Sequence, residues 1–514
     1  MFQQSLILPV TLLFIGGANA QAAGLPVRNI TGQNPWINLP AKLPKYARTL
    51  PKNLLGLSIE MDQWPQWAGT TLGSPNKFVN TVLNNIASRT GYAVNLRVGA
   101  FPFPEATYVA IGKDFYALSA NMPAGTDFTW GLNLRVFNAS ESVAQAVQLV
   151  SLFIEEYDTF YGSRAAMLKN VTLKLIELGN EPDLYFFRGA AYNNVELTNY
   201  TQTWISTAGQ ILSSIDLTFP GAPGFQIGAW ADAYRDSIFT VAGTLGTGIL
   251  DSAAGALVKS FSVHNYFGRH TGDPVTEPKN GQLMGRSTIR GNVTRFAAQV
   301  PQAEAAGMDY VLGETNSFSS HGSPGLSDSA EAALWLVDFS LQLASVGVNR
   351  IYFHEGVGFA YNLIQPVPIP GNGTTATSVP RVQAAYYGAL MVAEAIGTGA
   401  NTKVAELPSN STSIAAYGIW ENERLARAVI INSDVYFAGA TNGTRSSKTV
   451  SLGGYSNGKT SIKRLTAPGA NSTEVLWAGQ NFTLGDPTGS VRETWLNSST
   501  ITLEATEAVL LCFK

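Results

Sequence analysis

The chain has 514 residues, of which 45% are hydrophobic and 13% charged, with a formal net charge of −3. We therefore expect two or three domains, or one large barrel with an accessory domain. No long basic run is present, which argues against a nucleic-acid partner and against a strong electrostatic hold on highly sulfated polyanions. The composition favours a neutral or mildly acidic substrate.

The first twenty residues are typical of a cleaved signal peptide. An apolar stretch at residues 2–17 precedes Ala18-Asn19-Ala20, a small-x-small cleavage pattern, and it is too short to span a membrane. We therefore predict a secreted, extracellular protein with no membrane segment. The single cysteine, Cys512, cannot form an internal disulfide.

N-glycosylation signals support secretion. Eleven Asn-x-Ser/Thr sites without an intervening proline predict N-glycans on several of them. They begin at Asn29, Asn138, Asn170, Asn199, Asn292, Asn372, Asn410, Asn442, Asn471, Asn481 and Asn497.

After a loop-like, proline-containing segment at 21–50, strands and helices alternate. Eight apolar runs read as strands, at 54–60, 92–98, 130–138, 173–178, 224–230, 258–266, 308–312 and 350–354. Helical spacing of apolar residues predicts helices at 75–88, 142–157, 199–215 and 329–345, the last of them amphipathic. Eight such units are the number that closes a (β/α)₈ TIM barrel.

Beyond residue 380 the pattern changes. A helix is still expected at 381–394, but short alternating segments at 414–417, 426–432, 461–465 and 508–512 then follow between Gly, Pro, Asn and Ser turns. This pattern predicts a β-sandwich. We therefore divide the chain into a signal peptide (1–20), an N-terminal segment (21–50), a catalytic barrel (51–395) and a C-terminal β-sandwich domain (396–514).

Two glutamates follow glycines at predicted strand ends. Glu181 lies after Gly179-Asn180 and before Pro182, which stops the strand, and Glu314 follows Gly313. Barrel enzymes carry their chemistry at the C-terminal ends of the strands. A glycosidase needs such a pair, one acid to protonate the leaving oxygen and one carboxylate to attack or to activate water.

These motifs carry a family resemblance. Asn180-Glu181-Pro182 resembles the acid/base motif on the fourth strand of the clan of retaining (β/α)₈ glycosidases. Leu312-Gly313-Glu314-Thr315 resembles the seventh-strand nucleophile motif of glycoside hydrolase family 79, which contains heparanase and β-glucuronidases. The resemblance to a fungal-type secreted member runs over most of the mature chain. It implies that the N-terminal segment joins the sandwich.

The resemblance also implies roles for single residues. Glu181 is the expected acid/base and Glu314 the expected nucleophile, with Glu355 as the rival of Glu314; Glu177, inside its strand, is expected to be a paired structural charge. His264 is expected to orient the catalytic residues without contacting the substrate. The expected substrate-binding residues are Glu60, Asn180, Tyr266, Ser320, His321, Gly322 and Tyr361. The last four substrate-binding positions are those expected to bind a carboxylate, and none of them is Lys or Arg. The loop from Gly99 to Pro104 departs from the family pattern, which puts its sugar contacts in doubt.

The implied activity is that of a retaining, exo-acting β-glucuronidase. It would release terminal β-linked glucuronic acid, with or without a 4-O-methyl group, from a glycan or proteoglycan. No cofactor is implied, and the four histidines show no spacing typical of a metal site. The alternatives are a heparanase-like endo-glucuronidase, another retaining β-glycosidase of the clan such as a β-glucosidase or glucanase, and a catalytically silent carbohydrate-binding protein.

Overall fold

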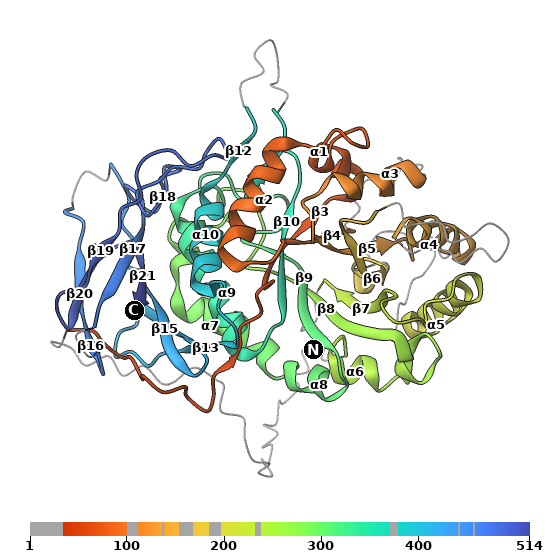
Figure 1. Ribbon diagram of the computed structural model, residues 1–514, viewed down its shortest axis with the longest axis horizontal. Coiled ribbons are helices and arrows are strands. Elements are labelled where there is room, and N and C mark those ends of the chain that lie inside the picture. Colours follow the sequence, from red (N-terminus) through yellow and green to blue (C-terminus); the bar gives the residue numbers. More distant parts are fainter. Residues whose placement is uncertain are drawn as a thin grey trace, which may run out of the picture.

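A computed structural model describes residues 34–99, 111–135, 138–153, 168–184, 197–231, 238–369, 379–439, 443–455 and 458–514. Within these ranges the chain forms a closed barrel and a β-sheet domain beside it (Figure 1). The expected fold class, a (β/α)₈ barrel with a C-terminal β-sandwich, is confirmed. The predicted signal peptide and the segment 100–110, which includes most of the atypical loop, lie outside the described residues.

The barrel consists of eight parallel strands in the order β10-β3-β4-β5-β6-β7-β8-β9. Their bounds are β3 Leu55–Ile59, β4 Asn95–Val98, β5 Asp127–Leu132, β6 Thr172–Leu178, β7 Gly224–Trp230, β8 Val258–Tyr266, β9 Asp309–Asn316 and β10 Arg350–Glu355. The predicted bounds of β7 and β8 are confirmed residue for residue. β4 begins three residues later than predicted, because the preceding helix ends only at Gly91.

The prediction for the third barrel strand, residues 130–138, is wrong. β5 ends at Leu132, and a side-chain turn follows in which Asn133 Oδ1 accepts a hydrogen bond of 2.9 Å from the Arg135 N–H. Such local bonds from asparagine compete with the ladder of a sheet. The apolar run in the sequence therefore extends beyond the strand that it contains.

Helices cover the outside of the barrel. The long ones are α2 Lys77–Thr90, α4 Ala139–Phe153, α5 Leu197–Ser214, α7 Arg286–Ala297, α9 Ala330–Val346 and α10 Ala384–Ile396; short ones are α1 Trp64–Ala68, α3 Lys113–Ala117, α6 Val241–Leu245 and α8 Val300–Ala305. Short 3₁₀ turns occur at Met61–Gln63, Leu118–Asn121, Ile249–Asp251, Gly255–Leu257 and Gln282–Met284. α2 shows why the helices start and stop where they do. The Asn76 side chain caps its first turn by accepting from Val79 N, and Gly91 ends it in the left-handed conformation, φ 77°.

Two sheets form the second layer of the molecule. The larger has the order β18-β17-β21-β15-β14-β13-β2, with β19 paired to β17, and the smaller has the order β1-β16-β20. Their strands are β1 Trp36–Asn38, β2 Arg48–Thr49, β13 Thr402–Glu406, β14 Ile414–Glu421, β15 Arg424–Asn432, β16 Ser447–Gly453, β17 Thr460–Thr466, β18 Leu476–Trp477, β19 Thr494–Trp495, β20 Thr500–Glu504 and β21 Glu507–Phe513. A short hairpin, β11 Ile364–Gln365 with β12 Arg381–Val382, follows the last barrel strand. β1 and β2, from the N-terminal segment, pair with β16 and β13.

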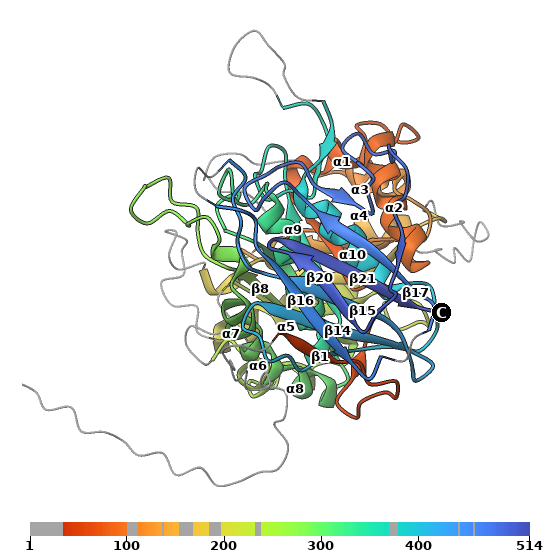
Figure 2. The same ribbon diagram turned by 90° about the vertical axis from the view of Figure 1, so that its left-hand side faces the viewer.

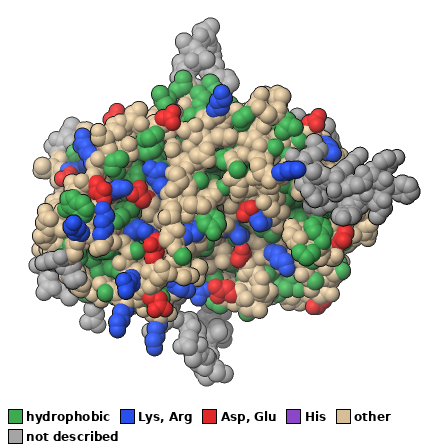
Figure 3. All heavy atoms as spheres, viewed as in Figure 1, with side chains coloured by type: hydrophobic (Ala, Val, Ile, Leu, Met, Phe, Trp, Pro, Cys, Tyr) green, Lys and Arg blue, Asp and Glu red, His purple; other side chains and the backbone are tan. Residues whose placement is uncertain are grey.

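The larger sheet shares a core with the barrel. One of its faces, with Tyr417, Val429 and Leu510, belongs to the apolar cluster that also holds α9 and α10; its other face packs against the smaller sheet. Figures 1 and 2 show α9 and α10 between the barrel and the sheets. α9 is consequently buried on all sides instead of only one, so its predicted amphipathic character is wrong. On the face seen in Figure 3, charged side chains are scattered among uncharged ones.

Candidate active site

The C-terminal strand ends bring the two predicted acids together. Glu181 follows β6 and Glu314 lies in β9, and they are joined by His264 from β8. One carboxylate oxygen of each glutamate and one ring nitrogen of His264 all lie within 4.8 Å of one another. Retaining glycosidases hold their two carboxyl groups about 5–5.5 Å apart, whereas inverting enzymes need roughly 6.5–9.5 Å. The short separation suits direct attack by one of the two acids.

The backbone holds Glu181 in an unusual conformation. Gly179 turns the chain with φ 91°, and Glu181 itself has φ 50°, in the left-handed region that side chains avoid. The Glu181 N–H donates to Ala229 O at 3.0 Å, and His264 Nδ1 lies 3.0 Å from Glu181 Oε1. The Glu181 side chain remains 22% exposed, so it can exchange a proton with a bound molecule or with water.

Glu314 lies deeper and is surrounded by donors. Tyr266 donates its hydroxyl to Oε1 at 2.8 Å, and Arg97 donates to Oε2 at 3.1 Å. Burial alone would raise the pKa of Glu314, but His354, His264 and Arg97 together hold the pKa well below its usual range. Burial and the nearby carboxylate raise the pKa of Tyr266, so its phenol stays a donor. Glu314 is thus an ionised carboxylate across the working pH range of most proteins.

Arg97, on β4, connects the two acid-bearing strands. Its guanidinium is fully buried and donates to Glu177 at 2.6 Å and to Asn180 Oδ1 at 2.7 Å, as well as to Glu314. Gln226 donates to the other oxygen of Glu177 at 2.5 Å. Because Arg97 occupies the Asn180 oxygen, the Asn180 amide nitrogen is left to donate to a ligand.

A second buried pair lies next to Glu314. His354, from β10, is 3.2 Å from Glu60 Oε1, and its other nitrogen is 3.9 Å from Glu314 Oε2. Burial would lower the pKa of His354, but Glu314 and Glu60 raise it to about 9. The imidazolium therefore carries a positive charge between two carboxylates. The remaining oxygen, Glu60 Oε2, is buried without a hydrogen-bond partner among the described residues.

The sequence analysis did not identify Arg97 or His354 as site residues. Arg97 lies inside the predicted strand 92–98 and His354 at the end of the predicted strand 350–354, and no role was predicted for either. A charged residue inside an apolar strand was the available signal in each case, because a buried charge needs a partner.

The predicted carboxylate-binding residues also gather at this rim. Ser320, His321 and Gly322 follow β9 and are all left-handed, with φ of 61°, 69° and 84°. The His321 ring stacks on Phe359 at 3.9 Å, and Phe359 meets the buried ring of Tyr361 edge-on. Tyr361 lies 6.2 Å, ring to ring, from Tyr266. A chain of ring contacts therefore runs from His321 through Phe359 and Tyr361 to Tyr266, which donates to Glu314.

A cation lies closer to this loop than the sequence analysis expected. Arg269, in the loop after β8, donates from Nε to Ser320 Oγ at 3.1 Å. The sequence analysis did not predict Arg269 as a site residue, because its proximity to Ser320 depends on how two loops from neighbouring strands run side by side. None of the four predicted carboxylate-binding positions is Lys or Arg, but Arg269 from the neighbouring loop contacts one of them.

Glu355, the rival nucleophile, is fully buried, and its carboxyl group accepts hydrogen bonds from backbone N–H groups. Its carboxyl oxygens accept from Leu363 N at 3.0 Å and Ile364 N at 3.2 Å. Burial raises the pKa of Glu355 well above its ordinary value despite these bonds. An enclosed carboxyl group whose two oxygens accept from backbone N–H groups shapes the loop after β10 and is not placed to attack a sugar. Glu177, by contrast, forms the ion pair with Arg97 that was expected of it.

The sequence analysis found no metal-like spacing of His and acidic residues, but it considered only their positions along the sequence. Glu181, His264 and Glu314 come from three different strands, yet their ligand atoms are close enough to hold a cation. Sequence spacing cannot reveal such a cluster. The same proximity is what a pair of catalytic carboxylates requires.

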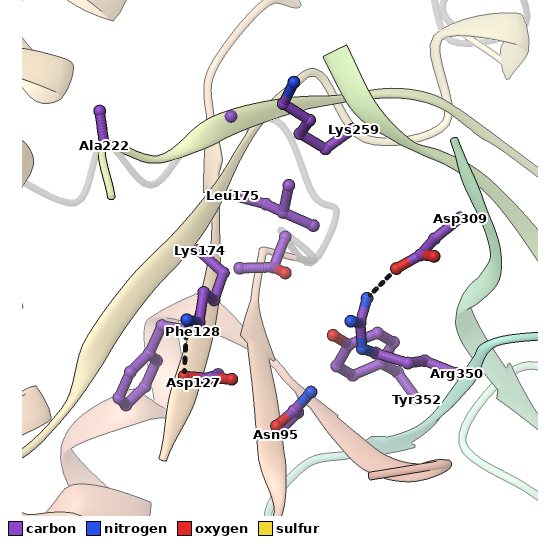
Figure 4. A pocket seen from close by; sticks show the side chains of 12 residues that line it. Asn95, Asp127, Phe128, Lys174, Leu175, Ala222, Lys259, Asp309, Arg350 and Tyr352 are labelled. Carbon is purple, nitrogen blue, oxygen red and sulfur yellow. Dashed lines mark hydrogen bonds and ion pairs between the residues drawn. The ribbon is translucent and has the colours of Figure 1, made fainter. Parts of the chain in front are cut away.

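A separate cavity of about 260 Å³ lies at the opposite end of the barrel. It is lined by residues at the strand starts, among them two ion pairs, Arg350–Asp309 at 2.9 Å and Lys174–Asp127 at 3.8 Å (Figure 4). The acid pair is not part of its lining, so the cavity is distinct from the candidate active site.

A closed parallel barrel with two close acids at its C-terminal rim defines a glycoside hydrolase. Sequence comparison gives the family. Residues 416–510 match the glycosyl hydrolase family 79 C-terminal beta domain. A beta-glucuronidase of Aspergillus niger is 30% identical, with 92% of this chain and 91% of that protein covered. A beta-glucuronidase of Neurospora crassa is 26% identical over 74% of this chain and 71% of its own. The chain belongs to glycosyl hydrolase family 79.

Solved structures agree with the fold. A 4-O-α-L-rhamnosyl-β-D-glucuronidase from Fusarium oxysporum 12S, determined as a Rha-GlcA complex, superposes with a TM-score of 0.74 and 24% identity, covering 93% of this chain and all of that one. A family 51 α-L-arabinofuranosidase from Bifidobacterium longum superposes with a TM-score of 0.59 and 13% identity, over 94% of this chain and all of that one. The barrel with its accessory sheets is therefore shared beyond the family.

Proposed function

We propose that this protein is a retaining, exo-acting β-glucuronidase. It hydrolyses terminal β-linked glucuronic acid, with or without a 4-O-methyl group, from a glycan or proteoglycan. Membership of family 79 and two relatives named beta-glucuronidase support the activity. The observation that carries the mechanism is the separation of less than 4.8 Å between oxygens of Glu181 and Glu314.

The two acids take different roles because their surroundings differ. Glu314, buried and kept ionised by its neighbours, attacks the anomeric carbon and forms a covalent glycosyl-enzyme. Glu181, partly exposed and bonded to His264, protonates the departing oxygen. Glu181 then removes a proton from the water that releases glucuronic acid.

The remaining polar groups suit the sugar ring. Arg97 occupies the Asn180 oxygen, which leaves the Asn180 amide nitrogen for a sugar hydroxyl, and Glu60 lies beside His354 at the same rim. A bond from Asn180 to the 2-hydroxyl would strengthen in the transition state. Tyr266 holds Glu314 in its reactive orientation.

A run of three backbone amides supports recognition of the uronate carboxylate. In the described part of the chain, no protein acceptor satisfies the N–H groups of Ser320, His321 or Gly322. Successive unpaired N–H groups in a tight turn form a concavity that binds anions. The loop lies against Tyr361, whose backbone nitrogen is 2.7 Å from the position of a Cβ at Gly322. A glucoside, which lacks the carboxylate, would leave these amides without a partner.

A panel of aryl β-glycosides tests this function. We expect release of the aryl group from the glucuronide and little from the glucoside, galactoside or xyloside, with β-glucuronic acid as the first-formed anomer by NMR. Preferred turnover of the glucoside would identify another retaining β-glycosidase of the clan. Binding without turnover would identify a silent carbohydrate-binding protein.

Product analysis on glycans separates exo from endo action. We expect free monosaccharide from chains that end in glucuronate, 4-O-methyl-glucuronate or rhamnosyl-capped glucuronate if the cap is tolerated. The last substrate is included because of the structural likeness to the Fusarium oxysporum enzyme. Internal cleavage of heparan chains would identify a heparanase-like endo-glucuronidase.

We propose that the protein acts outside the cell and carries N-glycans. Among the described sites, Asn138, Asn170, Asn199, Asn471 and Asn497 are exposed, whereas Asn410 is buried and accepts a hydrogen bond from Trp36 N. Among the described helices, none combines the length and hydrophobicity needed to cross a membrane. Glycopeptide mapping of protein recovered from culture medium tests both parts, with Asn410 expected to be unmodified.

A further inference from the structure

The three residues at the carboxylate-binding turn are strained. Ser320 and His321 are side-chain-bearing residues with positive φ, followed by Gly322, which is also left-handed. A left-handed residue with a Cβ costs about 1–2 kcal/mol, so such a run persists only where neighbouring contacts fix it. Those contacts consequently determine where the three amide N–H groups point.

The loop after β8 fixes one side of the turn. Ser319 N donates to Gly268 O at 2.9 Å, and His270 N donates to Ser319 O at 3.0 Å. Arg269 adds its bond to the Ser320 hydroxyl. The turn is thus tied to a second loop immediately before the left-handed run.

A single carboxylate ties the two loops together immediately after the run. Glu277 Oε1 accepts from Ser323 Oγ and lies 2.7 Å from His270 Nδ1. Glu277 Oε2 accepts from Thr271 N at 2.9 Å and from Gly272 N at 3.0 Å. Ser323 and His270 together hold the pKa of Glu277 well below its usual range. Both oxygens of an ionised group are therefore engaged by donors from two separate loops.

We propose that Glu277 is a positioning residue for the uronate subsite. It does not touch the sugar; it holds Ser323, and through Ser323 the orientation of the amides of residues 320–322. This inference rests on the proposed function, because it concerns how the same site selects a carboxylate. Without Glu277 the turn relaxes toward ordinary backbone angles and the three amides diverge.

The wider loop retains other anchors when this contact is lost. Ser323 N donates to Ser327 Oγ at 2.9 Å, and Ala360 N donates to His321 O at 2.7 Å. Loss of the Glu277 contact should therefore misplace the amides without unfolding the barrel. Selectivity for the carboxylate is then the property that changes first.

The test is Glu277→Gln in the full chain. The introduced glutamine carries an NH₂ group in place of one carboxylate oxygen. Because both oxygens of Glu277 accept hydrogen bonds, this NH₂ group must face a donor. We expect KM for an aryl β-glucuronide to rise by roughly ten- to a hundredfold, with a smaller change in kcat. The inhibition constant of D-glucuronate should rise in parallel, whereas that of D-glucose should change less than twofold.

Two variants serve as controls. Glu304→Gln makes the same replacement in an exposed ion pair with Arg48, away from the acid pair, and should leave all constants unchanged. Ser323→Ala removes the contact through which Glu277 acts, and it should shift the ratio of the glucuronate and glucose inhibition constants in the same direction as Glu277→Gln. Thermal unfolding of each variant reports whether the fold is intact.

The outcomes separate the two hypotheses. If wild-type protein hydrolyses no glucuronide, the proposed function fails whatever Glu277 does. If wild-type protein hydrolyses glucuronides, but Glu277→Gln leaves the glucuronate-to-glucose inhibition ratio unchanged, the positioning role is wrong. Equal weakening of both sugars would likewise assign Glu277 to the fold alone.

Discussion

The chemistry of single residues in this site depends on where each lies relative to bulk water. Glu314 is almost enclosed and surrounded by donors, while Glu181, a few ångströms away, reaches the solvent. One carboxyl group is therefore fixed as an anion, and the other keeps access to protons. Two glutamates acquire two roles from their surroundings.

Replacing each acid by glutamine should separate these roles. Glu314→Gln should abolish turnover of every glycoside, because no other described group can form the glycosyl-enzyme. Glu181→Gln should lose roughly 10²–10⁴-fold on substrates with poor leaving groups and much less on activated aryl glycosides, which need little protonation. Azide should accelerate the second variant and yield a glycosyl azide, detectable by mass spectrometry. Identical behaviour of both variants, with no azide product, would overturn the assignment.

The phenol of Tyr361 should contribute to carboxylate selection. A hydrogen bond to an ionised acceptor is worth about 1.5–3 kcal/mol, so Tyr361→Phe should lower kcat/KM for a glucuronide about ten- to a hundredfold. Residual glucosidase activity should hardly change. Equal losses on both sugars would show that Tyr361 serves the ring or the fold, since its side chain is buried.

His354 should make the folded state sensitive to alkaline pH. Its pKa is raised to about 9 in the folded protein, above the ordinary 6.5 of an unfolded chain. Its stabilisation is therefore complete below about pH 6.5 and is lost as pH rises toward 9. The loss is on the order of 3 kcal/mol in the free energy of unfolding.

Urea unfolding at pH 6 and pH 9.5 measures this effect. His354→Gln should be less stable than the wild type at pH 6, and its stability should vary less between the two pH values. A wild-type protein whose free energy of unfolding is equal at both pH values would show that His354 is neutral in the folded state.

Among the strands, Arg97 acts as a cross-connection inside the barrel. β4 carries it, and its partners lie on β6, β9 and the turn after β6. Breaking a buried ion pair on one side leaves an uncompensated charge, which costs about 3–5 kcal/mol. The network therefore positions the nucleophile and stabilises the barrel at once.

Substitution of Arg97 by methionine tests both consequences. We expect a loss of about 3–5 kcal/mol in stability together with a large fall in kcat, because Glu177 and Glu314 lose their shared cation. Arg350→Met is the matched control, since its pair with Asp309 is partly exposed and worth at most about 1 kcal/mol. Calorimetry and kinetics on both variants give the comparison, and equal destabilisation would contradict it.

The strands and acids could be predicted because their signals are local. β7 and β8 are short apolar runs bounded by turn residues, and Glu181 and Glu314 each follow a glycine at a strand end. The position of the third strand could not be predicted, because the apolar run continues past the turn at Asn133. Local pattern gives an element but not always its end.

Partnerships across the barrel were not predictable. Arg97 and Glu177 are 80 positions apart, and His354 and Glu60 are 294 apart. Whether a buried charge is compensated depends on the closed barrel and not on its own segment. The contact between Glu277 and Ser323 was not predicted for the same reason. The two residues are 46 positions apart, and nothing near Glu277 in the sequence indicates Ser323.

At the scale of the whole molecule, barrel and sheets share one interface and should unfold together. The Tyr417 hydroxyl of the larger sheet lies within hydrogen-bond distance of both Asp338 and Gln342 on α9. Arg286 and Arg290 on α7 pair with Glu406 of β13. Nearly all residues of α9 and α10 are buried in the full chain, and most of them are apolar. A barrel cut after Ile396 would expose them to water.

We therefore expect a single calorimetric transition for the full chain and aggregation of residues 34–396 expressed alone. Tyr417→Phe should lower the free energy of unfolding by about 1–3 kcal/mol without splitting the transition, since it leaves buried acceptors unpaired. Two separated transitions, or a soluble and active isolated barrel, would show that the two units fold independently.

The pairing of β1 with β16 places a constraint on biosynthesis. Trp36 pairs with Ser451 in the smaller sheet, so the first described strand cannot form its ladder until a partner about 400 residues later in the chain has been synthesised. At roughly 5–20 residues per second, translation leaves that strand without its ladder for about 20–80 s. The barrel strands emerge during this interval, and β1 can join only afterwards. Completion of the smaller sheet is thus tied to synthesis of the C-terminal sheet domain.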